Sequence, residues 1–184
     1  MRRRFERAGL FVAAAALAGG VLTVGACAQQ VSGNAQVNTA DLSAYTSEVT
    51  ASSIAASSSR AAAVEDATGA ACDAFLTANG SSVKVFNEYI DVSNSKGRDD
   101  PEVNTKADAA VGALHDNASS VDTAVTPDVP SNVADPLHAY RDDSNALADT
   151  LGSRADTDTL NVAVDKFNAT KDTALNACKG HGSR

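Results

Sequence analysis

The sequence predicts an all-α fold, an antiparallel four-helix bundle whose helices run up, down, up and down. Apolar residues recur at alternating steps of four and three along much of the chain, a spacing that places them on one stripe of a helix. Asp-Pro pairs and single glycines divide this pattern into segments of helical length. No segment alternates convincingly between apolar and polar residues, so strands are not expected. We place the bundle at residues 62–180 and a short tail at 181–184.

Between the N-terminal leader and the bundle lies a Ser/Ala-rich segment, residues 39–61. Its first half can form a helix with Leu42, Tyr45 and Val49 on one face. The serine cluster that follows dilutes this pattern. Two interpretations therefore stay open, an extra N-terminal helix that packs on the bundle and a stalk that does not.

The first bundle helix is predicted to run from Ala62 to Ser95. Gly97 follows as its stop, because glycine readily adopts the left-handed conformation that ends many helices. The pair Asn79-Gly80 lies in the middle and could kink or split the helix. The residues expected to face the core share one stripe, Cys72, Leu76, Val83, Phe86 and Ile90.

Asp100-Pro101 predicts the start of the second helix, with Asp100 as N-cap and proline at the first helical position. Pro127 and Pro130 end it, because proline cannot continue the hydrogen-bond ladder. The acidic residues beside Asp100 are interpreted as helix capping and not as a cation site, since they lack the calcium-loop pattern. The predicted bundle seam consists of Val103, Ala107, Ala110, Leu114, Ala118, Val121 and Val125.

The same Asp-Pro pattern, at Asp135-Pro136, predicts the start of the third helix. The fourth helix follows Gly152 and an Asp/Thr-rich turn, and Gly180 is placed to end it. Because short connections favour antiparallel neighbours, the four helices should run up, down, up and down. The core-facing residues predicted for these two helices are Leu137, Tyr140, Ser144, Leu147 and Leu151, then Leu160, Val164, Phe167, Ala174 and Cys178.

The first 26 residues have the three-part layout of an export signal. An Arg-rich start (MRRRFER) precedes an apolar run (AGLFVAAAALAGGVLTV) and two small residues before Cys27. Residues 24–27, VGAC, resemble the lipobox of bacterial lipoproteins, with Val24 where leucine is commoner. The resemblance covers residues 1–27 only. It implies that the Cys27 thiol receives a diacylglyceryl group and that a peptidase removes residues 1–26.

This resemblance predicts that the mature protein is anchored by lipid at the extracytoplasmic face of the cell membrane. Residues 27–38 would then be the lipidated cysteine and a flexible polar tether. Two other interpretations stay open. The sequence ACA at residues 26–28 also fits ordinary signal cleavage, and residues 8–26 are long enough for a retained transmembrane helix.

Three cysteines are an awkward number for an exported chain, since one must stay unpaired. If Cys27 is acylated, Cys72 and Cys178 remain, and a disulfide between them is the default expectation in an oxidising compartment. The predicted topology agrees, because it places the start of the first helix and the end of the fourth at the same end of the bundle. Two buried reduced thiols are the alternative.

No catalytic or metal-binding constellation is evident in the sequence. The three histidines, His115, His138 and His181, lack the four-residue spacing of a helical zinc site and are interpreted as surface or internally satisfied residues. There is no CxxC pair, no G-x-S-x-G motif and no Gly-rich phosphate loop. We therefore expect no metal, no cofactor and no enzymatic activity.

The formal net charge is −8, although the first seven residues carry four arginines. An acidic surface without a basic patch disfavours nucleic-acid binding. The predicted function is an interaction or structural module of the cell envelope, bound to the membrane through diacylglyceryl-Cys27 and to an envelope protein partner. The alternative is a lipoprotein that binds a lipid or another small molecule, which needs a cavity of several hundred Å3. We expect alanine-rich seams to leave little room for one.

Overall fold

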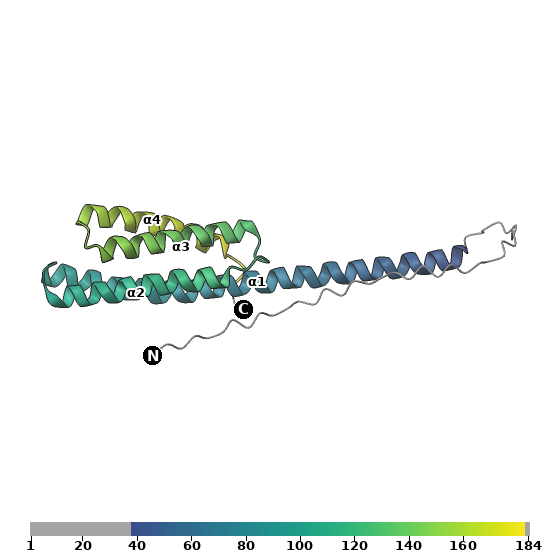
Figure 1. Cartoon of the computed structure of the whole chain (residues 1–184), viewed down its shortest axis with the longest axis horizontal. Helices are drawn as coiled ribbons and strands as arrows, with labels where there is room; N and C mark the ends of the chain where they lie inside the picture. The colour runs from purple at the N-terminus through teal and green to yellow at the C-terminus, as the bar shows by residue number, and fades with distance from the viewer. Residues whose placement is uncertain (1–37, 183–184) are drawn as a thin grey trace, which may run out of the picture. The chain divides into compact units, whose positions relative to one another are not determined.

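The computed structural model describes residues 38–182. Four helices make up this part of the chain, α1 (Thr39–Lys96), α2 (Pro101–Ala124), α3 (Ser131–Gly152) and α4 (Thr157–Ala177). Successive helices run in opposite directions, as Figure 1 shows. The described residues contain no strand, so the predicted all-α four-helix bundle is confirmed. The predicted signal peptide, Cys27 and nearly all of the tether lie outside the described residues.

Helix α1 is a single helix where the sequence suggested two segments. The Ser/Ala-rich segment 39–61 and the predicted first helix form one element of 58 residues. Gly80 does not interrupt it, because this residue is exposed and Phe75 and Phe86 anchor the helix in the core on both sides. Gly97 ends α1 as predicted, with φ of 81° and its N–H donating to the carbonyl of Ser93 at 3.1 Å.

The predicted stripe of α1 is wrong at one position, since Cys72 and Phe86 are buried, Val83 and Ile90 are half-buried against the core, and Leu76 is not part of it. Leu76 was expected in the core but is 41% exposed, whereas its neighbour Phe75 is fully buried. The Phe75 ring lies edge-on to the Tyr140 ring of α3, with centroids 4.8 Å apart. The contact of α1 with α3 is therefore made by Phe75 and not by Leu76. The buried residues of α1 are Thr68, Ala71, Cys72, Phe75, Ser82, Phe86 and Tyr89.

The predicted start and seam of α2 are confirmed. Asp100 caps the helix, its carboxylate accepting from the backbone N–H of Glu102 at 2.8 Å, and Pro101 is the first helical residue. Val125 is half-buried at the C-cap. The other six predicted seam residues are buried, and the structure adds Asn117, a polar residue that is 2% exposed.

The predicted start of α3 is wrong by about one turn. The helix begins at Ser131, with Pro130 as N-cap, so that Pro136 lies inside it. The carbonyl of Pro130 accepts from the N–H groups of Val133 and Ala134, both at 2.9 Å. Val133 is fully buried, and its burial offsets the one helical hydrogen bond that Pro136 cannot make. All five core residues predicted for α3 are buried.

The disulfide predicted between Cys72 and Cys178 closes one end of the bundle. The two Cα atoms are 5.5 Å apart, and 106 residues separate the cysteines in sequence. Both cysteines are buried. The bond joins α1 to the C-cap of α4. This is the end of the bundle where the predicted topology placed the start of the first helix and the end of the fourth.

Polar contacts hold the opposite end of the bundle. Arg98, after α1, donates to the backbone carbonyl of Arg154 at 3.2 Å. Arg154, after α3, has a positive φ of 55° and donates through its guanidinium group to the carboxylate of Asp108 at 2.7 Å. The first bond connects the turn between α1 and α2 to the turn between α3 and α4, and the second connects the latter turn to α2.

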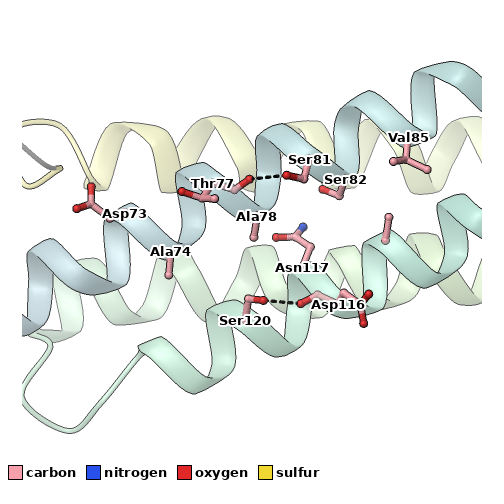
Figure 2. Close-up of a pocket in the computed structure, with 11 residues that line it drawn as sticks. Asp73, Ala74, Thr77, Ala78, Ser81, Ser82, Val85, Asp116, Asn117 and Ser120 are labelled. Atoms are coloured by element: carbon pink, nitrogen blue, oxygen red, sulfur yellow. Dashed lines mark hydrogen bonds between the residues drawn. The ribbon is translucent and has the colours of Figure 1, made fainter.

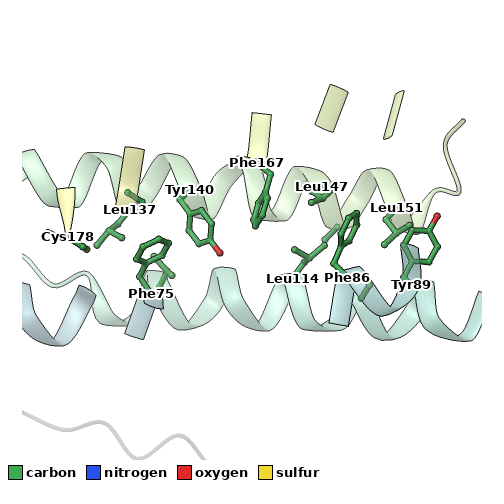
Figure 3. Close-up of a cluster of buried hydrophobic side chains, with 14 of the residues drawn as sticks. Phe75, Phe86, Tyr89, Leu114, Leu137, Tyr140, Leu147, Leu151, Phe167 and Cys178 are labelled. Carbon is green, nitrogen blue, oxygen red and sulfur yellow. The ribbon is translucent and has the colours of Figure 1, made fainter. Parts of the chain in front are cut away.

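Aromatic side chains fill the centre of the core, as Figure 3 shows. The ring of Tyr140 lies between Phe75 of α1 and Phe167 of α4, and its centroid is 5.3 Å from that of Phe167. Leu160 and Ala174 of α4 are also buried, whereas Val164 is half-buried. Each ring buries a large apolar area, so this cluster supplies much of the bundle's stability.

The first part of α1, residues 39–63, is exposed at every position. Among the described residues, no helix is both long enough and apolar enough to cross a bilayer. Serine and threonine side chains of the exposed part donate to the carbonyls of the preceding turn, for example Ser47 to Ser43 at 2.9 Å and Ser57 to Ser53 at 2.8 Å. The segment is a helical stalk and does not pack on the bundle.

Candidate functional site

An open groove with a volume of about 590 Å3 lies between α1 and α2. Figure 2 shows the side chains that both helices contribute to it. Small residues line much of its length, among them Ala74 and Ala78 of α1 and Ala113 of α2. The predicted seam alanines Ala107, Ala110 and Ala118 are buried, and the alanines that line this open groove lie outside that seam.

Three of the hydroxyl groups that line the groove give their protons to backbone carbonyls. Ser81 donates its proton to the carbonyl of Thr77 at 3.1 Å, and Ser82 donates to the carbonyl of Asn79 at 3.2 Å. Ser120 of α2 donates to the carbonyl of Asp116 at 2.8 Å. A hydroxyl has a single proton to give, so each of these groups can only accept a further hydrogen bond.

At the base of the groove, the amide of Asn117 belongs to a buried polar network. Its Nδ2 donates to the Tyr140 hydroxyl at 2.5 Å and to Ser144 Oγ at 3.2 Å. The Tyr140 hydroxyl in turn donates to Asn79 Oδ1 at 3.0 Å, and Ser144 Oγ donates to the carbonyl of Leu114 at 3.0 Å. Because both hydroxyl protons are used, Asn117 must turn its NH2 group toward them.

This orientation leaves the carbonyl oxygen of Asn117 without a hydrogen-bond partner, although the side chain is almost completely buried. A buried acceptor that stays unpaired costs roughly 1–3 kcal/mol. Figure 2 shows the amide projecting from α2 into the space between the two helices. The groove therefore contains a group that gains stability when a donor reaches it.

Burial also acts on the Tyr140 hydroxyl. It raises the pKa of Tyr140 to about 12, while the hydrogen bond from Asn117 acts in the opposite direction. The phenol is consequently a neutral donor near pH 7 and keeps the network intact. The groove itself carries negative charge from the carboxylates of Asp73 and Asp116, and no residue that lines it is cationic.

The histidines do not meet in one site. His115 lies on the α2–α3 face, where its Nδ1 is 3.0 Å from Asn145 Oδ1 and its Nε2 is 3.5 Å from Asp149. His138 is half-buried in α3, and His181 lies beside a second groove at the disulfide end. Within residues 38–182, no three potential metal-ligating side chains come together.

Neither the groove nor the role of Asn117 was predicted from the sequence. Asn117 stands between Leu114 and Val121 at seam spacing, directly before the predicted seam residue Ala118. A polar residue at that spacing is the signal that could have identified it. The unpaired oxygen depends on partners in α1 and α3, which the sequence of α2 alone does not contain.

A model of the Rv2240c four-helix bundle domain matches residues 54–179. The matched region holds most of α1, all of the other three helices, both disulfide cysteines and the groove. No curated protein matches the chain, and no solved structure does.

Proposed function

Because the chain belongs to the family of the Rv2240c four-helix bundle domain, we propose a function that rests on the groove this bundle carries. In this proposal the protein is a lipid-anchored binding module at the extracytoplasmic face of the cell membrane. It binds an envelope partner in the groove between α1 and α2. The observation that carries the proposal is the groove itself, whose lining groups mostly accept hydrogen bonds, together with the unpaired carbonyl of Asn117.

The stalk of α1 supports the proposal that the groove is held away from the membrane surface. Residues 39–63 are exposed and helical, and they follow directly on the predicted tether. At 1.5 Å per residue this segment is roughly 37 Å long. A helix of that length, placed between a lipidated Cys27 and the bundle, would hold the groove away from the bilayer surface.

The hydrogen-bond partners of the serine hydroxyls in the groove favour binding over catalysis. Ser81, Ser82 and Ser120 donate to backbone carbonyls and not to a neighbouring base. A serine nucleophile needs a base within hydrogen-bond reach to take its proton. The groove therefore offers recognition groups, and we propose that no bond is made or broken there.

Membrane attachment is tested by replacing the lipid-accepting thiol. The Cys27→Ala variant should lose lipid labelling and leave the membrane fraction, which fractionation and immunoblotting would reveal. Cys72→Ser with Cys178→Ser is the matched control, because it changes cysteines without touching the lipobox. Membrane retention of unlabelled Cys27→Ala would overturn the anchor.

The groove is tested by a photo-crosslinking residue at Thr77, which lines it. The matched control carries the same residue at Thr173, which is exposed on α4. The Thr77 variant should give a discrete adduct in intact cells, which mass spectrometry identifies, and the control should not. Equal adducts at both positions, or none at Thr77, would contradict a binding role for the groove.

The alternative, a small-molecule-binding lipoprotein, is favoured by one observation, a volume within the roughly 300–1,000 Å3 of ligand pockets. The lining nevertheless lacks aromatic side chains, so a lipid is a poor fit. Native mass spectrometry of the full-length protein from its own membranes separates the two functions. A bound small molecule supports the alternative, and a protein adduct alone supports the envelope-partner proposal.

A further inference from the structure

We infer that the α1–α2 groove binds an aliphatic primary amine, whose ammonium group lies against Asn117 and Asp116 while its carbon chain lies on the alanines. This inference rests on the proposed function and specifies the chemistry of the occupant. The two helices place these groups together although they are far apart in sequence, since Ala74 and Ala78 come from α1 and Asp116 and Asn117 come from α2.

Most of the hydrogen-bonding groups that line the groove favour a ligand that donates. The protons of Ser81, Ser82 and Ser120 are given to backbone carbonyls of their own helices, so these three hydroxyls can only accept from a ligand. Asn117 adds a carbonyl oxygen and Asp116 adds a carboxylate. A ligand rich in acceptors, such as a phosphate or a carboxylate, would meet repulsion from every one of these groups.

The unpaired oxygen of Asn117 is a second observation, independent of the negative charge. The side chain is 2% exposed, and its NH2 group is held by Tyr140 and Ser144. The amide cannot turn to satisfy the oxygen without losing both of these bonds. A donor that enters from the groove is what the arrangement lacks.

A primary ammonium group fits these acceptors better than other cations do. It has three N–H donors, enough to serve Asn117, Asp116 and one hydroxyl oxygen at once. A quaternary ammonium has no donor and is recognised by aromatic faces, which the lining of this groove does not provide. The carboxylate of Asp116 adds attraction, and no lining side chain is cationic.

The shape of the groove suits a thin carbon chain. Its α1 wall extends from Asp73 to Val85, which is about 18 Å along the helix axis. Methyl groups of Ala74, Ala78 and Ala113 line it, so methylene groups can lie against apolar surface. Two sources carry this chemistry, a free diamine and the lysine side chain of a protein partner.

The test is an amide NMR titration of the full-length protein in detergent micelles, with pentane-1,5-diamine as the probe. Saturable shifts should concentrate at amides that line the groove. Pentane-1,5-diol, which has the same chain without the charge, should leave them unchanged. Shifts that do not saturate, or that spread equally to the acidic residues of α4, would overturn the inference.

Two pairs of variants locate the effect. Asp116→Asn should weaken diamine binding by about three- to fivefold, whereas Asp172→Asn, the same change at an exposed position of α4, should not alter it. Ala78→Leu should block the groove and abolish binding, and Ala146→Leu, at an exposed position of α3, should leave it intact. Equal effects within either pair would refute the site.

The buried acceptor is tested by Asn117→Leu, which preserves volume and removes the oxygen. Tyr140 and Ser144 keep the bonds that they donate, so the thermal transition should remain cooperative while binding falls at least tenfold. If this variant does not fold, the Asp116 and Ala78 pairs decide the question. Unchanged binding by folded Asn117→Leu would remove Asn117 from the site.

The source is identified by comparing pentane-1,5-diamine with Nα-acetyl-lysine methylamide. Tighter binding of the diamine indicates a free amine, and equal binding together with a protein adduct at Thr77 indicates a partner lysine. If neither amine binds but Thr77 still gives its adduct, the chemistry inferred here is wrong and the proposed function stands. If Thr77 and Thr173 behave alike, the proposed function itself fails.

Discussion

Helix α1 has two parts with the same backbone and opposite surroundings. Residues 39–63 are exposed throughout, whereas the part from Thr68 to Tyr89 contributes two phenylalanines, a tyrosine and a disulfide cysteine to the core. The exposed part is rich in serine and threonine, whose hydroxyls bond to the preceding turn. The buried part is held by its contacts with the other helices.

The two parts of α1 together explain how a long helix can project beyond its domain. Helix nucleation is unfavourable, but elongation from an existing turn is not. The packed part of α1 supplies that turn, and the alanine-rich stalk extends it without a core of its own. Substitutions of buried residues in the packed part should therefore be severe, and substitutions in the stalk should be mild.

The largest difference should separate two neighbouring residues. Phe75→Ala should lower the free energy of unfolding by about 3–5 kcal/mol, because it empties a ring-sized space in the core. Leu76→Ala should lower it by well under 1 kcal/mol, since Leu76 is exposed. Urea denaturation followed by circular dichroism measures both. Equal losses would show that the buried stripe of α1 is placed wrongly.

Removing the disulfide should have the next largest effect. The Cys72→Ser and Cys178→Ser double variant should lose roughly 2–4 kcal/mol, because the unfolded chain is no longer constrained over 106 residues. The same measurement on the reduced wild-type protein is the control. A loss below about 0.5 kcal/mol in both would mean that the bond contributes little to the bundle.

Alkaline pH should destabilise the bundle through Tyr140. Its pKa is raised to about 12 in the fold, above the ordinary value of 10.0, so the folded state favours the protonated phenol. Stability is therefore fully present below pH 10 and falls as pH rises toward 12, by up to about 2–3 kcal/mol. Tyr140→Phe should flatten this fall in denaturation curves taken between pH 9 and 12. An unchanged slope would contradict it.

The smallest effect is expected in the stalk. A triple variant, Leu42→Ser with Tyr45→Ser and Val49→Ser, should change the stability of the bundle by less than about 0.5 kcal/mol, because all three side chains are exposed. Urea denaturation again serves as the measurement. A loss above 1 kcal/mol would show that the stalk has a packing partner.

Much of the fold followed from local signals. Asp100-Pro101 and Gly97 marked helix ends because capping and proline geometry act within a few residues. The start of α3 was misplaced because the burial of Val133 outweighs the local preference of Asp135-Pro136. Phe75 was missed in favour of Leu76 because neighbouring apolar residues fit a helical stripe almost equally well, and only contact with Tyr140 decides between them.

The candidate site was less accessible to sequence reasoning. Whether a groove forms depends on which alanines of a helix face its neighbour. The amino-acid composition does not contain that information. The unpaired oxygen of Asn117 exists because Tyr140 and Ser144 donate elsewhere, a fact that involves three helices. The disulfide was predictable, since cysteine count and topology constrain it together.

The central claim is that α1 is a stalk in its first part and a wall of the bundle and groove in its second. Hydrogen exchange along α1, measured on the full-length protein, tests this most directly. Amides of residues 39–63 should exchange quickly, and those between Thr68 and Tyr89 should exchange orders of magnitude more slowly, at rates set by unfolding of the bundle. Equal protection along the whole helix would contradict the claim.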